Sequence, residues 1–258
     1  MKKFLIGAVG LVAMATSASA ADLGRPYTKA PPPMMVAMYD WSGFYIGLNG
    51  GGGSSHKCWD ITRDDIGPII PAEAEGCHDA TGGTVGGQIG YRWQSSAFVF
   101  GLEAQGNWAN FRGSNANLLD PLGTRDHSQI DAFGLFTGQV GYAWNNALLY
   151  VKGGAAVTSD KYNTSDIPTG LVFDRASETR WGGVIGVGLE YGFTPNWSFG
   201  VEYDHMFMGT RDVSFYGVGT FGVAPGVFTA TDHIRQDVDV FTARLNYKFG
   251  VGPVVARY

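Results

Sequence analysis

The feature that most constrains the fold is an alternation of apolar and small or polar residues, which recurs along most of the chain. One clear example is the stretch Gln139, Val140, Gly141, Tyr142, Ala143 and Trp144. A period of two places successive side chains on opposite faces, so the stretch predicts a β-strand with one apolar face. A soluble sandwich would bury that face, whereas a membrane barrel would expose it to lipid. Periodicity alone is compatible with both.

Eight segments show this alternation, and their lengths are comparable with the roughly 9 to 11 residues of a tilted membrane strand. Their predicted bounds are 41–51, 84–94, 97–108, 130–144, 147–158, 180–191, 197–205 and 240–249. Three connections are tight turns at 94–96, 145–146 and 194–196, and the other four are long. Long and short connections alternate in outer-membrane barrels, whose short turns face the periplasm. The pattern therefore predicts an all-β, eight-stranded antiparallel up-and-down transmembrane barrel.

The N-terminus has the layout of a secretory signal peptide, with a basic pair, an apolar run and an Ala-Ser-Ala triplet that ends at Ala20. We expect a signal peptide at 1–20, a proline-rich periplasmic linker at 21–40 and the barrel at 41–258. After the signal, no apolar run approaches the roughly 20 residues of a spanning helix, so any membrane crossing must use strands.

Composition favours the membrane alternative. Charged residues make up 16% of the chain, whereas a soluble domain has about 25% and needs them for its exterior. Asp and Glu number 23 against 18 Lys and Arg, so the chain lacks the clustered basic charge that nucleic-acid binding requires.

Aromatic residues gather near the predicted periplasmic ends of the strands, as an interfacial girdle requires. The predicted girdle consists of Trp93, Trp144, Tyr191, Trp197, Tyr247 and Phe249. The alternative is a secreted lipocalin-like barrel with these residues inside. The low charge content and the alternation of turns favour the membrane barrel.

The opposite face of the strands carries four basic and four acidic residues: Arg92, Lys152, Arg244, Lys248, Glu103, Glu190, Glu202 and Asp204. An enclosed charge is costly unless it is paired. The balanced set predicts a lumen cross-linked by ion pairs. Because eight strands enclose little more than the volume of their own side chains, a wide diffusion pore is not expected.

The only two cysteines, Cys58 and Cys77, lie in one polar segment of an exported chain. This placement favours a disulfide that closes a loop. A metal site is the alternative, because His56 and His78 flank the two cysteines, but the tight Cys-x-x-Cys spacing of such sites is absent.

All five histidines fall in the predicted loops or at their rim: His56, His78, His127, His205 and His233. Three of them follow an aspartate, in the pairs Asp126-His127, Asp204-His205 and Asp232-His233. Adjacent strand residues point to opposite faces, so Asp204 and His205 cannot form a catalytic dyad. Cross-loop pairs and haem or zinc ligation remain alternatives to a role as polar loop residues.

The last predicted loop contains four aromatic residues: Phe215, Tyr216, Phe221 and Phe228. They could form a contact patch for a ligand, another barrel or a host surface, or they could pack across the barrel mouth.

Three motifs carry a resemblance to a known family: the run Trp-Ser-Gly-Phe-Tyr-Ile-Gly-Leu-Asn-Gly-Gly at 41–51, the Gly-Tyr-x-Trp hairpin ends, and Leu-Asn-Tyr-Lys-Phe at 245–249. In these the chain resembles the porin-like outer-membrane surface-antigen family of alphaproteobacteria, also called outer-membrane immunogenic proteins. The resemblance implies an abundant eight-stranded surface barrel, related in architecture to OmpA-type barrels, without family-wide catalytic residues. Barrels of this kind commonly end at an aromatic residue recognised by the assembly machinery, and here either Phe249 or Tyr258 could serve.

The expected function is therefore a structural and surface-exposed role in the Gram-negative outer membrane, without catalytic residues, metal or cofactor. The alternatives are a narrow passive porin for small solutes and a haem-binding surface receptor. The expected partners are outer-membrane lipid and lipopolysaccharide, the barrel assembly machinery, and host or envelope surface components. Nucleic acid is not among them.

Overall fold

A computed structural model of the protein describes residues 39–250. The expected signal peptide at 1–20, all but the last two residues of the expected linker at 21–40, and Tyr258 lie outside the described residues.

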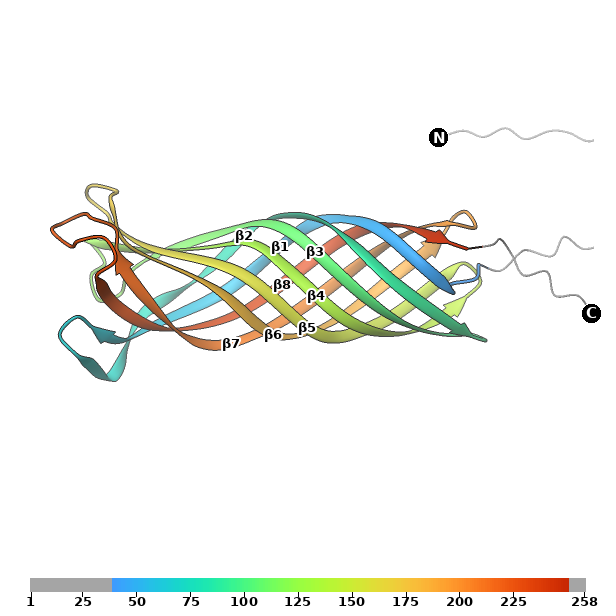
Figure 1. Ribbon diagram of the computed structural model, residues 1–258, viewed down its shortest axis with the longest axis horizontal. Coiled ribbons are helices and arrows are strands. Elements are labelled where there is room, and N and C mark those ends of the chain that lie inside the picture. The colour runs from blue at the N-terminus through green and yellow to red at the C-terminus, as the bar shows by residue number, and fades with distance from the viewer. Residues whose placement is uncertain (1–38, 251–258) are drawn as a thin grey trace, which may run out of the picture. The chain divides into compact units, whose positions relative to one another are not determined.

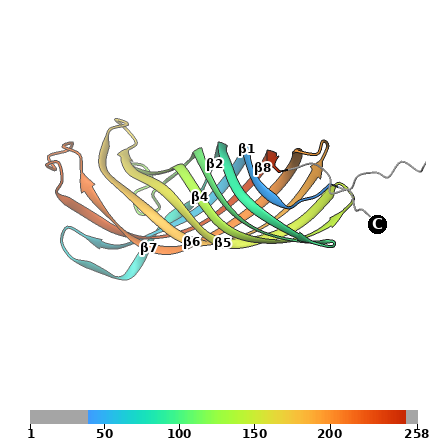
Figure 2. The ribbon, with the colours of Figure 1, turned by 45° about the vertical axis from the view of Figure 1, so that its right-hand side comes forward.

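Eight antiparallel strands run up and down and close into a barrel in the order of the sequence (Figure 1). They are β1 (Gly43–Asp64), β2 (Pro68–Ser95), β3 (Phe98–Ala116), β4 (Thr124–Trp144), β5 (Ala147–Asp166), β6 (Val172–Gly192), β7 (Trp197–Gly217) and β8 (Phe228–Phe249). Both views show β1 beside β8 (Figures 1 and 2), where Phe44 pairs with Phe249. Closure leaves no open sheet edge, and the predicted fold class is confirmed.

The short turns all lie at one end of the barrel, at the right of Figure 1. Residues 96–97 connect β2 to β3, and residues 145–146 connect β4 to β5. Ser96 and Asn145 have positive φ angles of 57° and 52°. Asparagine reaches this left-handed region more readily than most residues because its short polar side chain bonds to the nearby backbone. The tight turns predicted at these two positions are confirmed.

The strands are much longer than predicted, and the supposed long loops are mostly strand. Residues 52–83, predicted as a loop, form the outer parts of β1 and β2, joined by residues 65–67. The inward and outward alternation continues there, with Ser55 buried and His56 exposed. Because polar residues occupy both faces, the hydrophobic pattern does not reveal these strand extensions.

An apolar belt surrounds the half of the barrel nearest the short turns. Five of the six predicted girdle residues are at least 40% exposed there, and Tyr247 is half-buried. A second group of exposed aromatic residues marks the other border of the belt: Trp108, Phe136, Trp181, Phe207 and Phe241. Such a wide exposed apolar surface fits lipid rather than water, which answers the question that periodicity leaves open.

None of the described residues belongs to a helix that is long and apolar enough to cross a membrane.

Candidate functional site

The lumen is the part of the molecule where charged side chains converge, and Arg244 of β8 stands at its centre. Its guanidinium forms ion pairs with Glu103 of β3 and with Glu202 of β7. Lys152 of β5 lies 2.7 Å from Glu202 and 3.1 Å from Asp204. All five side chains are nearly inaccessible to solvent. Four strands are thus linked through charges in the interior.

A second ion pair lies closer to the short turns. Arg92 of β2 donates to Glu190 of β6 at 2.8 Å. The Arg92 guanidinium also lies 4.5 Å from the ring centroid of Tyr45 and 5.6 Å from that of Trp41. Stacking on aromatic faces and pairing with a carboxylate are both favourable for a buried guanidinium. Together with Tyr39, which packs on Trp41, these residues fill the short-turn end of the lumen. We call this region, including the ion pairs of Arg244, the lower charged layer.

Lys248 was predicted to belong to the ion-pair network of the lumen, but it pairs with none of the predicted acidic residues. Its Nζ contacts Asp40, at the backbone oxygen and at 4.0 Å from the carboxylate, and lies 5.0 Å from the ring centroid of Tyr39. The inward direction of the side chain was correct. Its position only one residue before the end of β8, however, places it at the rim, where residues just before β1 supply the partner.

A dry apolar layer follows the charges and was not predicted. It consists of Ala80, Phe111, Ile130, Phe133, Leu135, Ala156, Val184, Met206, Met208, Val238 and Val240. Each of these side chains is at most 4% exposed. These apolar side chains come from seven strands, β2 to β8, and their close packing inside the barrel excludes water from this level. We call this the apolar layer.

Beyond the apolar layer lies an upper charged layer, also absent from the sequence prediction. Lys57 of β1 pairs with Asp160 of β5 at 2.8 Å, and both are fully buried. Arg180 of β6 donates to the backbone oxygen of Ile234 at 2.8 Å. Continuing the alternation of Tyr45 and Asn49 along β1 would have indicated that Lys57 points inward.

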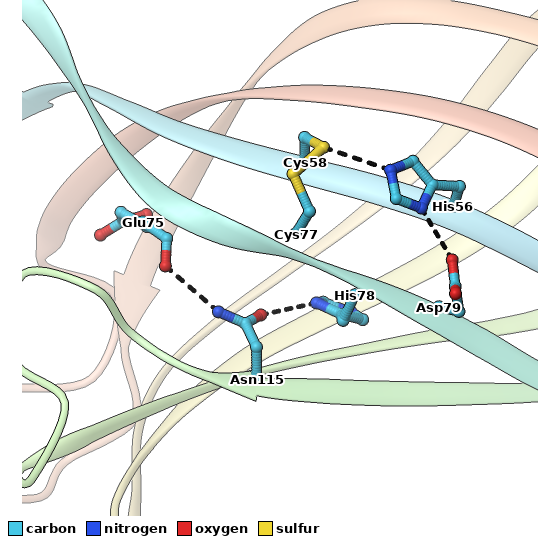
Figure 3. Close-up of a disulfide and its surroundings, with 7 residues drawn as sticks. All are labelled: His56, Cys58, Glu75, Cys77, His78, Asp79 and Asn115. Carbon is cyan, nitrogen blue, oxygen red and sulfur yellow. Dashed lines mark hydrogen bonds and ion pairs between the residues drawn. A yellow bond between two sulfur atoms is a disulfide. The ribbon is translucent and has the colours of Figure 1, made fainter.

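The two cysteines form a disulfide between directly opposite residues of β1 and β2, with Cα atoms 4.1 Å apart (Figure 3). His56 lies beside it, with Nε2 3.5 Å from the Cys58 sulfur and Nδ1 2.7 Å from Asp79. The other flanking histidine, His78, points inward and contacts Asn115 and Ser128. Burial lowers the pKa of His78. The two histidines therefore do not converge on one metal site.

The three Asp-His pairs do not form dyads within themselves. In each pair the aspartate is buried and the histidine is at least partly exposed. Instead, His205 lies 2.7 Å from Asp239 and His233 lies 2.6 Å from Asp212, each across neighbouring strands. His127 contacts the hydroxyl of Ser165. The first two contacts join partly or fully exposed side chains on the outer surface of β7 and β8, whereas Ser165 is buried.

The aromatic residues predicted in the last loop separate into two groups. Phe215 is buried and packs on Trp59 and Tyr162 inside the barrel. Tyr216 and Phe221 are exposed. Because Phe215 and Tyr216 belong to β7, alternation sends one inward and the next outward. They do not form a single patch.

Comparison with known proteins agrees with this architecture. Residues 6–249 match a family described as the outer membrane protein beta-barrel domain. The 31 kDa outer-membrane immunogenic protein of Brucella melitensis is 29% identical over 260 residues, covering 96% of this chain and 100% of that protein. A 22 kDa outer membrane protein of Rhizobium leguminosarum is 27% identical over 176 residues, covering 67% of this chain and 66% of that protein.

Among solved structures, the outer membrane protein OprG of Pseudomonas aeruginosa has a TM-score of 0.52 at 15% identity, covering 83% of this chain and 99% of that one. The outer membrane protease OmpT of Escherichia coli has a TM-score of 0.54 at 10% identity, covering 82% and 98%. At these identities the likeness concerns the fold alone. The chain belongs to the outer membrane protein beta-barrel domain family and resides in the outer membrane.

Proposed function

We propose that this barrel has a structural and surface-exposed, non-enzymatic role in the outer membrane, with a lumen closed to solutes. The observation that carries the proposal is the stacking of three layers inside the barrel. The lower charged layer around Arg244, the apolar layer around Phe111 and the upper charged layer around Lys57 occupy successive levels of the lumen.

These layers oppose passage in different ways. Most of the ion pairs link strands that are not neighbours, such as β3 with β8 and β1 with β5. An ion that broke one would leave a buried charge without its partner, which is costly. The apolar layer offers an ion no polar group to replace its water shell. Because eight strands leave little room beyond their own side chains, no wide passage remains beside these layers.

The surface role is supported by the strands that continue past the apolar belt. These extensions carry polar residues outward and end in exposed connections, with Ile66 at 91% and Leu122 at 86% exposure. Loops in such positions commonly carry function because they face outward on a rigid scaffold. The relative from Brucella melitensis is named an immunogenic protein, which supports contact with host or envelope surface components.

Assembly is the remaining part of the proposal. Phe249 is the last residue of β8 and pairs with Phe44 at the seam of the barrel. An exposed aromatic at this end of the final strand suits recognition by the barrel assembly machinery before closure.

Conductance in a planar bilayer tests the closed lumen. We expect the purified wild type to be silent, and Glu103→Gln or Arg244→Gln to show intermittent steps because each leaves a buried charge unbalanced. Asp131→Asn is the matched control, because Asp131 pairs with Lys161 on the exposed surface, and this variant should be silent too. Steady open-channel steps in the wild type would overturn the proposal and identify a small porin.

A further inference from the structure

Two cysteines, one histidine and one aspartate form a compact group on the outer surface of β1 and β2 (Figure 3). In the pairing of the two strands, Cys58 lies directly opposite Cys77 and His56 lies directly opposite Asp79. Residues two positions apart on a strand share a face, and opposite residues on paired strands are neighbours. All four side chains therefore leave the sheet on the same side. We call them the Cys-His group.

The His56 ring connects the carboxylate to a sulfur. Its Nδ1 lies 2.7 Å from Asp79 Oδ1, and its Nε2 lies 3.5 Å from Cys58 Sγ. The carboxylate favours the tautomer with the proton on Nδ1, which leaves the lone pair of Nε2 free to bind a metal. Histidines that ligate zinc are commonly oriented by a carboxylate in this way. The nitrogen that would bind a metal thus faces the sulfur.

Other histidines on the outer surface share the carboxylate but lack the sulfur. His205 and His233 each place Nδ1 beside an aspartate, at 2.7 Å and 2.6 Å. Among residues 39–250, only His56, Cys58 and Cys77 bring three possible ligand atoms from histidine, cysteine or acidic side chains within 4.8 Å of one another. A surface ion pair accounts for the other two histidines, but it does not account for the sulfur beside His56.

The Cys-His group is accessible from the medium. The side chains of His56 and Asp79 are 59% and 63% exposed, and Cys77 is exposed as well. The group lies on the strand extensions beyond the lipid belt. In barrels of this kind the end opposite the short turns faces the outside of the cell. A reductant and a metal ion can therefore both reach it.

The disulfide itself blocks metal binding, because a metal ion binds the thiolate form of cysteine. A dithiol reductant removes this block by thiol–disulfide exchange. Two electrons and two protons pass to the sulfurs of Cys58 and Cys77, and the dithiol becomes a cyclic disulfide. Strand pairing continues on both sides of the two cysteines, so the freed thiols stay close together and beside His56.

The donor set and its spacing indicate zinc. Zinc binds thiolate at about 2.3 Å and imidazole nitrogen at about 2.1 Å, which places the two donor atoms about 3.6 Å apart in a tetrahedral site. The observed distance from His56 Nε2 to Cys58 Sγ is 3.5 Å. Magnesium and calcium prefer oxygen ligands. Three protein ligands leave the fourth tetrahedral position to water.

We propose that the reduced protein binds one Zn²⁺ between Cys58, Cys77 and His56. On binding, each thiol releases one proton and forms one zinc–sulfur bond, and His56 Nε2 donates its lone pair. Asp79 is a positioning residue, which holds the imidazole in the binding orientation. The disulfide and the zinc ion are then alternative links between β1 and β2, the first in an oxidising medium and the second after reduction.

Cobalt chloride is the probe, because Co²⁺ occupies tetrahedral zinc sites and its bonds to thiolate absorb in the near ultraviolet. The purified full protein in nonionic detergent micelles is reduced with dithiothreitol, freed of the dithiol without oxygen and titrated. We expect one equivalent of Co²⁺ per chain, with thiolate absorption that disappears when zinc chloride is added. The oxidised protein should show no such absorption.

Three variants assign the ligands. Asp79→Asn should weaken zinc binding by about 10- to 100-fold and retain the thiolate absorption at saturating Co²⁺. His56→Ala should weaken zinc binding further, because it removes a ligand. His233→Ala is the matched control, since His233 pairs with an aspartate on the same outer surface, and it should bind zinc as the wild type does.

Folding of each variant is checked by its heat-dependent electrophoretic mobility, and all three should fold because they alter exposed side chains. A reduced wild type without thiolate absorption in the presence of Co²⁺ would overturn the proposal. Equal zinc affinity in the wild type and His56→Ala would do the same, because the histidine would then not be a ligand. Half an equivalent of Co²⁺ per chain would also contradict it, since the ion would be shared between two molecules.

Discussion

The ring of Tyr150 lies directly against Gly188 of the neighbouring strand, where an added Cβ would be 2.3 Å from the ring. From this position the Tyr150 hydroxyl donates to Glu202 at 2.5 Å and accepts from Arg244 at 2.9 Å. A second tyrosine repeats the arrangement: Tyr45 lies against Gly90, and its hydroxyl donates to Glu103. The two carboxylates that pair with Arg244 are thus each positioned by a tyrosine that needs a glycine beneath it.

Replacing Gly188 with alanine should therefore disturb the lower charged layer. The new methyl group would displace the Tyr150 ring, and overpacking of this kind costs about 1–3 kcal/mol. We expect the free energy of unfolding in urea to fall by that amount. Gly183→Ala is the control, since Gly183 lies on the same strand and its Cβ would have no neighbour closer than 3.9 Å. Equal losses in both variants would show that the tyrosine contact is unimportant.

Removing the central cation of the lower charged layer should be more damaging. Arg244→Met leaves Glu103 and Glu202 without their shared partner, and breaking a buried ion pair in this way costs about 3–5 kcal/mol. Lys161→Met breaks the exposed pair with Asp131, which is expected to cost at most about 1 kcal/mol. Urea unfolding followed by tryptophan fluorescence compares the two. If the free energy of unfolding falls equally in both variants, the buried ion pairs of Arg244 stabilise the protein no more than the exposed pair does.

The disulfide should stabilise only the part of the barrel beyond the lipid belt. A bond between residues 19 positions apart is worth about 3 kcal/mol in the chain-entropy model. The double variant Cys58→Ser, Cys77→Ser should therefore exchange backbone amides faster in residues 57–79, while residues 240–249 keep their protection. Hydrogen exchange with mass spectrometry measures both regions. Uniformly faster exchange would mean that the bond supports the whole barrel.

The lipid-facing halves of the strands could be predicted because one face there is apolar and aromatic. The outer halves could not, because polar residues on both faces remove the contrast on which alternation depends. The pair Lys57 and Asp160 illustrates how this missing contrast hides inward-facing residues. Each continues the inward phase of its strand, but both lie in segments that composition assigns to loops.

The apolar layer was missed for a different reason. Trp108 points outward, whereas Phe111 points inward and continues the inward phase of Gln105 and Asn107. Both Trp108 and Phe111 are apolar, so composition does not reveal which of them meets lipid. A barrel whose lumen is apolar at one level also contradicts the expectation of a wholly polar interior.

Four buried carboxyl groups at the loop end of the barrel, Glu75, Asp126, Asp174 and Asp232, give the protein a specific dependence of stability on pH. Burial, reinforced by Glu75, Asp126 and Asp174, raises the pKa of Asp232 to about 9. Burial, with Glu75 and Asp174, raises the pKa of Asp126 to about 8. In an unfolded chain aspartate titrates near 3.9. Between about pH 4 and pH 9 the folded protein thus holds protons that the unfolded chain has released, and the free energy of unfolding falls as the pH rises through this window.

Asp232→Asn removes one of these titrating carboxyl groups, because asparagine stays neutral at every pH. The variant should match the wild type most closely near pH 5 and gain a growing advantage in unfolding free energy at pH 7 and pH 9. Urea titrations at the three pH values, in amine-free buffer, measure this difference. Asp212→Asn, an exposed aspartate on the outer surface, should follow the wild type throughout. A difference between Asp232→Asn and the wild type that does not change with pH would mean that the pKa of Asp232 is not raised in the folded protein and that its carboxylate is ionised there.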